Sequence, residues 1–122
     1  MRFGTRAMGW CAVLVVLSVA TAVAHLRVDK TTPAADAVLA GSPQHIQVWF
    51  TQSPDPAISL LAVEGADGAI ELGDTMIHDD KSLMAMLPSA LDPGSYTVKW
   101  RTAGSDGHAQ RGDFAFTVRA AD

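Results

Sequence analysis

The sequence predicts an all-β domain, a sandwich of two packed β-sheets. After residue 24, short runs with apolar side chains at every second position recur along the chain, and turn-forming sequences separate them at intervals of roughly 8–12 residues. No stretch of this region repeats its apolar residues with a sustained helical period. The region holds 122 − 24 = 98 residues, which is enough for one small domain with a modest core.

The first half of this region contains two expected strands. Residues 44–50 alternate, so that Ile46, Val48 and Phe50 should share one face. Residues 57–63 are a second run of apolar, β-prone residues. Segments rich in proline and aspartate should form loops at residues 32–36 and 53–56.

The second half contains the remaining expected strands, most of them next to turn sequences. Residues 95–101 follow the strong turn signal at 91–94, and Tyr96, Val98 and Trp100 should alternate toward the interior. The other expected strands are residues 69–72, 82–87 and 114–118, with a polar loop or hairpin at 104–112.

Residues 1–24 are predicted to be a secretory signal peptide. Two arginines give a positive start, a mostly apolar run follows, and Ala22-Val23-Ala24 has the small-x-small pattern that signal peptidase accepts. The alternative is an uncleaved membrane anchor, but the run is near the lower length limit for spanning a bilayer, and its ending favours cleavage. We therefore expect a mature domain of residues 25–122 in the periplasm or outside the cell.

Cysteine usage and charge narrow the classes of function. Cys11 lies in the signal segment, so the mature chain can form no disulfide and offers no thiolate for a type-1 copper electron-transfer site. The signal segment carries two of the nine basic residues and none of the thirteen acidic ones, which leaves a net charge of 7 − 13 = −6. This acidic balance argues against nucleic acid and anionic lipid as partners.

Cleavage after Ala24 would make His25 the first residue of the mature chain. A histidine at a free N-terminus offers a metal ion two nitrogens, its α-amine and its ring Nδ1, which together close a chelate ring. An internal histidine cannot do this, because its backbone nitrogen is an amide. His25 is therefore a candidate metal ligand.

A second candidate is the segment Ser105-Asp106-Gly107-His108, between two expected strands. On an extended backbone Asp106 and His108 would point to the same side, and Gly107 would permit a tight bend. Alone, the motif is more typical of a hairpin turn with an exposed histidine. Together with His25 it offers three nitrogens and one oxygen, which suits tetragonal Cu(II), although zinc could use the same donors tetrahedrally.

Five sequence motifs occur together along the expected mature chain. They are His25-Leu26-Arg27, Val48-Trp49-Phe50-Thr51-Gln52, Pro93-Gly94-Ser95-Tyr96, Ser105-Asp106-Gly107-His108 and the alternating Phe114, Phe116 and Val118. In these the chain resembles the CopC family of small periplasmic copper-binding proteins, over almost the full mature length. The resemblance implies a Greek-key sandwich of about seven strands, of cupredoxin or immunoglobulin-like type. It also implies one Cu(II) at one end of the sandwich, bound by His25, Asp106 and His108.

The chain departs from the family pattern at two places. Gln52 stands where some members have a glutamate that can approach the copper, and we interpret it as a polar residue at a strand end. Some members also bind Cu(I) through a methionine-rich segment. Here the corresponding region holds Met76, His78, Met84 and Met86, without a dense cluster. Met84 and Met86 should share a face that fills the core, and we expect a protein that binds Cu(II) alone.

Three classes of function remain open. We expect a monomeric copper carrier or buffer without enzymatic activity, acting in copper tolerance or import. The resemblance to the CopC family also implies a separately encoded CopD-type membrane protein as a partner. The second class is a small copper-dependent oxidative enzyme with the same terminal-histidine site, but no row of aromatic residues for stacking on sugars is evident. The third is a metal-free immunoglobulin-like structural module.

Overall fold

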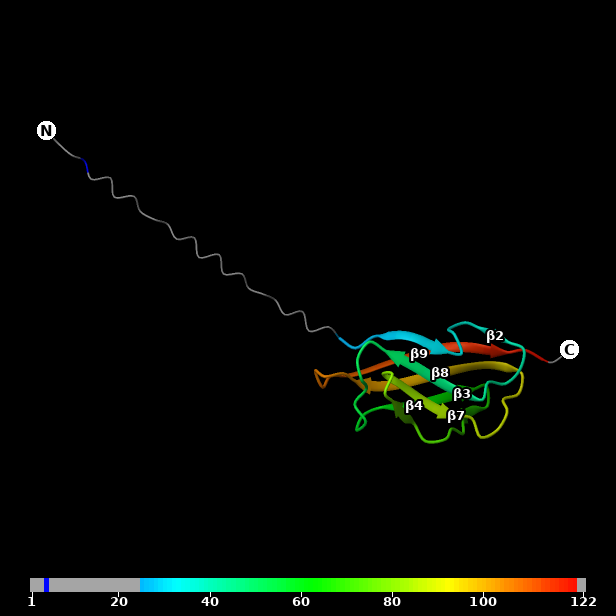
Figure 1. Cartoon of the computed structure of the whole chain (residues 1–122). Helices are drawn as coiled ribbons and strands as arrows, with labels where there is room; N and C mark the ends of the chain where they lie inside the picture. Colours follow the sequence, from blue (N-terminus) through cyan, green and yellow to red (C-terminus); the bar gives the residue numbers. More distant parts are fainter. Residues whose placement is uncertain (1–3, 5–24, 121–122) are drawn as a thin grey trace.

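The computed structural model describes Gly4 and residues 25–120, and the region 25–120 folds as a sandwich of two β-sheets (Figure 1). The all-β prediction is confirmed. Among the described residues, no helix is long and apolar enough to cross a membrane. The predicted signal peptide lies outside the described residues, apart from Gly4.

Within residues 25–120, nine strands make up the two sheets. In chain order they are β1 (Val28–Thr32), β2 (Val38–Leu39), β3 (His45–Phe50), β4 (Leu60–Gly65), β5 (Gly68–Ile70), β6 (Met76–His78), β7 (Ser82–Met86), β8 (Gly94–Ala103) and β9 (Ala109–Val118). The four-stranded sheet has the order β1-β3-β7-β6, and the five-stranded sheet the order β2-β9-β8-β4-β5. All pairs are antiparallel except β2 with β9.

The core lies between the two sheets and follows the predicted alternation. Ile46, Val48 and Phe50 of β3 are all buried, as expected. From the opposite sheet, Val98 and Phe116 are fully or almost fully buried. These residues belong to one continuous cluster, which removes apolar surface from water and is the main term that stabilises such a fold.

Two aromatic pairs fix the packing along the long β8–β9 hairpin. The rings of Tyr96 and Phe116 stack with centroids 5.5 Å apart. At the other end, Trp100 meets Phe50 of the opposite sheet edge-on, with centroids 5.2 Å apart. Trp100 is only partly buried, but it packs against the core as its position in the alternation predicts.

The strands that the sequence did not predict are short or polar. β1, β2 and β6 carry no clear apolar alternation, because each lies at the edge of a sheet and none of their residues is fully buried. Within residues 25–120 the fold has nine strands against the expected seven or so, and two of the unpredicted strands, β2 and β6, are only two and three residues long.

The expected strand at 57–63 begins later, at Leu60. A turn occupies the residues before it, where Asp55 accepts hydrogen bonds from the Ala57 N–H (2.9 Å) and the Ser59 hydroxyl (2.6 Å). When the side chain of an aspartate accepts a hydrogen bond from the backbone N–H two residues later, it stabilises a turn, and this local bond competes with strand pairing.

The expectation that Met84 and Met86 fill the core is wrong. The inward side chains of β7 are those of Leu83 and Ala85, both fully buried, whereas Met84 is half-buried and Met86 is 44% exposed. Both methionines do share a face, but it is the outer face of the four-stranded sheet. The register of β7 decides this, since a shift of one residue exchanges the two faces of a strand.

Candidate metal centre

The fold places His25 beside the loop that connects β8 and β9. The start of β1 and this loop lie at the same end of the sandwich, away from the C-terminus (Figure 1). Leu26 is fully buried and fixes the N-terminal segment to the core. Gly104 permits this approach, because a Cβ at that position would lie 3.1 Å from Cβ of Leu26 and 2.5 Å from Oε1 of Gln52.

The loop reaches its shape through a turn. The N–H of Gly107 donates to the Gly104 carbonyl at 3.0 Å, and Gly107 has a positive φ of 74°, a conformation that glycine adopts readily. The segment therefore forms a turn, which was the alternative to an extended backbone on which Asp106 and His108 would share a face. The turn itself brings them together.

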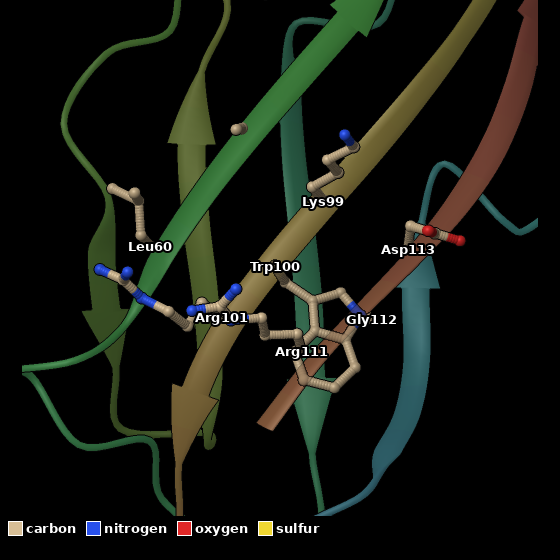
Figure 2. Close-up of a pocket in the computed structure, with 8 residues that line it drawn as sticks. Leu60, Lys99, Trp100, Arg101, Arg111, Gly112 and Asp113 are labelled. Carbon is tan, nitrogen blue, oxygen red and sulfur yellow. The ribbon is translucent and has the colours of Figure 1, made fainter. Parts of the chain in front are cut away.

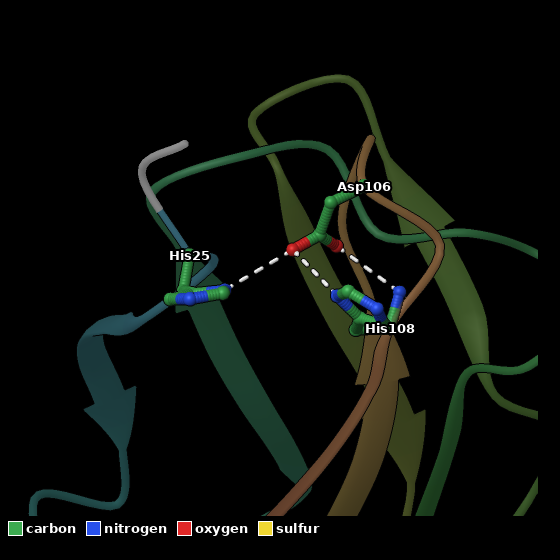
Figure 3. Close-up of side chains that lie close together, drawn as sticks. All are labelled: His25, Asp106 and His108. Carbon is green, nitrogen blue, oxygen red and sulfur yellow. Dashed lines mark hydrogen bonds and ion pairs between the residues drawn. The ribbon is translucent and has the colours of Figure 1, made fainter. Parts of the chain in front are cut away.

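His25, Asp106 and His108 converge although they lie far apart in the sequence. Asp106 Oδ2 lies 3.1 Å from His25 Nδ1 and 3.4 Å from His108 Nδ1. Figure 3 shows the Asp106 side chain between the two imidazole rings. The three donor atoms lie within 4.8 Å of one another, which is a spacing that a single metal ion can bridge.

The site is open on the histidine side and closed on the carboxylate side. The side chains of His25 and His108 are 66% and 77% exposed, whereas that of Asp106 is 9% exposed. Exchange of a ligand or an ion can therefore take place at the imidazoles without opening the core.

Local hydrogen bonds keep the carboxylate ionised. The backbone N–H of His108 donates to Asp106 Oδ1 at 3.1 Å, and this bond is the main reason that the pKa of Asp106 is lowered. Partial burial of the carboxyl opposes the shift, and the contacts with the two histidines add to it. Asp106 is thus an anionic oxygen donor throughout the neutral range.

Gln52 holds the loop, a role that sequence reasoning missed. Its Oε1 accepts hydrogen bonds from the backbone N–H and the hydroxyl of Ser105, each at 3.2 Å. Gln52 lies just after a strand, as expected, but its side chain also forms hydrogen bonds with Ser105, the residue before Asp106. A contact between residues 53 positions apart leaves no local signal in the sequence.

The other candidates lie on different surfaces. Met76 is paired in register with Met84, and His45 with Met86, on the outer face of the four-stranded sheet. His78 is exposed at the end of β6. Within the described part of the chain, His25, Asp106 and His108 form the one group of three or more histidine or acidic side chains close enough to share an ion.

Comparison with known proteins gives a consistent result. The CopC domain family matches residues 28–119. Protein YobA of Escherichia coli K12 is 31% identical over 101 residues, which cover 79% of this chain and 80% of that protein. The copper resistance protein C of Escherichia coli is 30% identical over 108 residues, covering 81% of this chain and 85% of that protein.

Solved structures agree with these matches. The crystal structure of CopC from Methylosinus trichosporium OB3b superposes with a TM-score of 0.70 at 30% identity, over 78% of this chain and 94% of that one. The family match spans both sheets and all the strands from β1 to β9. On its sequence and its fold, the chain belongs to the CopC family.

Proposed function

We propose that the mature protein begins at His25 and binds one Cu(II), which it carries or buffers in the periplasm. The ligands are the α-amine and imidazole of His25, the carboxylate of Asp106 and the imidazole of His108. The observation that carries this proposal is the convergence of the three side chains within 4.8 Å at one end of the sandwich.

The donor set favours Cu(II) over other metal ions. Nitrogen and oxygen donors in a near-square plane suit Cu(II), whereas thiolates are absent from residues 25–122. His25 presents its Nδ1 to Asp106. Nδ1 is the ring nitrogen that can close a chelate ring with the α-amine of the same residue, so the ring orientation supports the terminal chelate.

The exposure of the site supports a carrier better than an enzyme. Both imidazoles face solvent, which allows a partner to approach the ion and displace a ligand. A relative bears the name copper resistance protein C, which fits a role in copper tolerance. The physiological partner would be a separately encoded CopD-type membrane protein, and the carrier itself would act as a monomer.

Copper titration of protein that starts at His25, read by electron paramagnetic resonance, tests the proposal. We expect one equivalent of Cu(II) with a tetragonal type-2 spectrum and nitrogen couplings. The control is His45→Ala, since His45 lies on a different surface and its loss should change neither stoichiometry nor spectrum. A type-1 spectrum, or no stoichiometric binding, would contradict the proposal, and oxygen uptake with ascorbate and a glycan would favour an oxidative enzyme instead.

A further inference from the structure

The outer face of the five-stranded sheet has a shallow pocket of about 490 Å³ (Figure 2). Three neighbouring strands line it. Its side chains include Leu60 and Ala62 of β4, Lys99 and Arg101 of β8, and Arg111 and Asp113 of β9. The register places these residues in two rows across the sheet, Leu60–Arg101–Arg111 and Ala62–Lys99–Asp113.

This face carries an unusual share of the positive charge. Lys99, Arg101 and Arg111 are three of the seven basic residues that follow residue 24, in a region with a net charge of −6. Two acidic residues lie near Lys99, because it forms an ion pair with Glu64 at 3.1 Å and Asp113 is its partner in register. The positive charge of Lys99 is therefore compensated by carboxylates, and the surplus positive charge lies in the other row.

The surplus charge belongs to two arginines that face each other. Arg101 and Arg111 are directly opposite across β8 and β9, an arrangement that costs free energy when both residues carry the same charge. Arg101 donates from Nε to the Ile58 carbonyl at 3.2 Å. Within residues 25–120, the side chain of Arg111 forms no hydrogen bond or ion pair, and neither guanidinium contacts a carboxylate.

The pocket also has an apolar part. Leu60 is 49% exposed and lies opposite Arg101, with Ala62 in the next row. In Figure 2 the side chains of Arg101 and Arg111 both extend across the sheet toward the strand that carries Leu60. Guanidinium groups beside an apolar floor match a ligand that carries carboxylates next to apolar side chains, since arginine binds carboxylates in a planar, bidentate geometry.

We propose that this face is a docking surface for an acidic segment of a partner protein, whose carboxylates bind Arg101 and Arg111 and whose apolar side chain covers Leu60. The same two strands lead into the loop that holds Asp106 and His108. A partner bound here would therefore lie beside the metal centre. The proposal does not depend on copper, because all its residues lie outside that centre.

A protein partner fits this face better than an anionic membrane. Attraction to a membrane depends on the charge that a broad surface presents, and the net charge of this domain is negative. The uncompensated positive charge here is confined to one row of the pocket, and acidic residues lie on one side of that row. A short acidic segment can contact that row alone, whereas an anionic membrane would also come close to the acidic residues on the rest of the domain.

Titration of metal-free, ¹⁵N-labelled protein starting at His25 with the peptide acetyl-Glu-Leu-Glu-Glu-Leu-Glu-amide tests the proposal. We expect chemical-shift changes centred on Leu60, Arg101 and Arg111, and binding that weakens with salt. The double substitution Arg101→Gln/Arg111→Gln should weaken binding about tenfold, as expected from the loss of charge-assisted hydrogen bonds. The matched control is Arg119→Gln, which removes a positive charge outside the pocket and should leave the affinity unchanged.

Three further titrations distinguish the partner class. The peptide with glutamine in place of glutamate should not bind. Citrate and vesicles that contain phosphatidylglycerol should give no shift changes that depend on Arg101 and Arg111. If citrate binds as tightly as the peptide with that dependence, the face is a small-molecule site, and if the vesicles do so, it is a membrane surface. Either result, or equal loss of peptide binding in the Arg119→Gln control, would overturn the proposal.

Discussion

The Asp106 carboxylate approaches Nδ1 of His25 to 3.1 Å across a sequence separation of 81 residues. The contact exists only when β1 and the β8–β9 hairpin are both in place, because each residue is carried by a different sheet. Metal binding at this position should therefore report on the folded sandwich, and copper should stabilise the fold by binding the native state.

The first prediction concerns the N-terminus. A mature chain that keeps Ala24 should bind Cu(II) much more weakly than a chain that starts at His25, because the nitrogen of His25 is then an amide and the short chelate ring is lost. Side-by-side competition titrations of the two proteins measure the difference. Equal affinities and identical spectra would show that the terminal chelate does not form.

The second prediction ranks the ligands. His25→Ala and His108→Ala should each reduce Cu(II) affinity by more than the roughly 10–100-fold that is typical of residues outside the first coordination shell. Asp106→Ala should cost less, since water can replace one oxygen donor. Competition titration of the three variants gives the order, and wild-type affinity in His108→Ala would remove that residue from the site.

The third prediction concerns Gln52. Gln52→Ala removes the acceptor for two hydrogen bonds from Ser105 and should lower Cu(II) affinity about tenfold, as for other supporting contacts. Gln52→Glu keeps an acceptor there and adds a negative charge near the cation, so its affinity should equal or exceed that of the wild type. Gln44→Ala, an exposed glutamine before β3, is the control. Equal loss in the alanine and glutamate variants would show that the hydrogen bonds to Ser105 do not position the loop.

The fourth prediction concerns pH. Copper should be released as pH falls from 8 to 5, because protons compete for imidazole and α-amine nitrogens, whose reference pKa values are about 6.5 and about 7.7–8.0. Asp106 should contribute nothing to release in this window, since the hydrogen bond from the His108 N–H holds its pKa below its usual value.

The same shift has a consequence for folding. A lowered pKa in the folded state stabilises the protein above the unfolded value of about 3.9, and the effect is lost as pH falls through the folded pKa. The prediction that Asp106 does not contribute to copper release is tested by the slope of Cu(II) affinity against pH between 8 and 5 in the Asp106→Asn variant. We expect the slope of the wild type, and a shallower slope would show that Asp106 takes up a proton in that range.

The fifth prediction concerns the packing of Trp100 between Gly112 and Phe50. A Cβ at Gly112 would overlap the indole ring of Trp100, so that Gly112→Ala must displace the indole from its edge-on contact with Phe50. We expect a loss of about 1–3 kcal/mol in the free energy of unfolding, the range for overpacked cores. Gly41→Ala, where no atom lies within 4 Å, should be neutral in the same urea titration. A neutral Gly112→Ala would show that Trp100 moves freely.

Local pattern was enough to predict most of the core. Ile46, Val48 and Phe50 are buried as their alternation indicates, because burial of one face imposes a period of two on any strand in a sandwich. The same rule located β7 but not its inner face, since Leu83 and Met84 are both apolar and only the pairing of β7 with β3 decides which points inward.

The sequence by itself determined the class of fold, the candidate ligands His25, Asp106 and His108, and the acidic balance of the domain. Tertiary structure alone decided that these ligands meet, that Gln52 holds their loop and that Arg101 faces Arg111. The alternation of apolar residues and the presence of turn-forming residues depend on a few neighbouring positions, so they can be recognised in short stretches of the sequence. Contacts between sheets depend on register and on glycines that let segments approach, and those become fixed only when the whole sandwich packs.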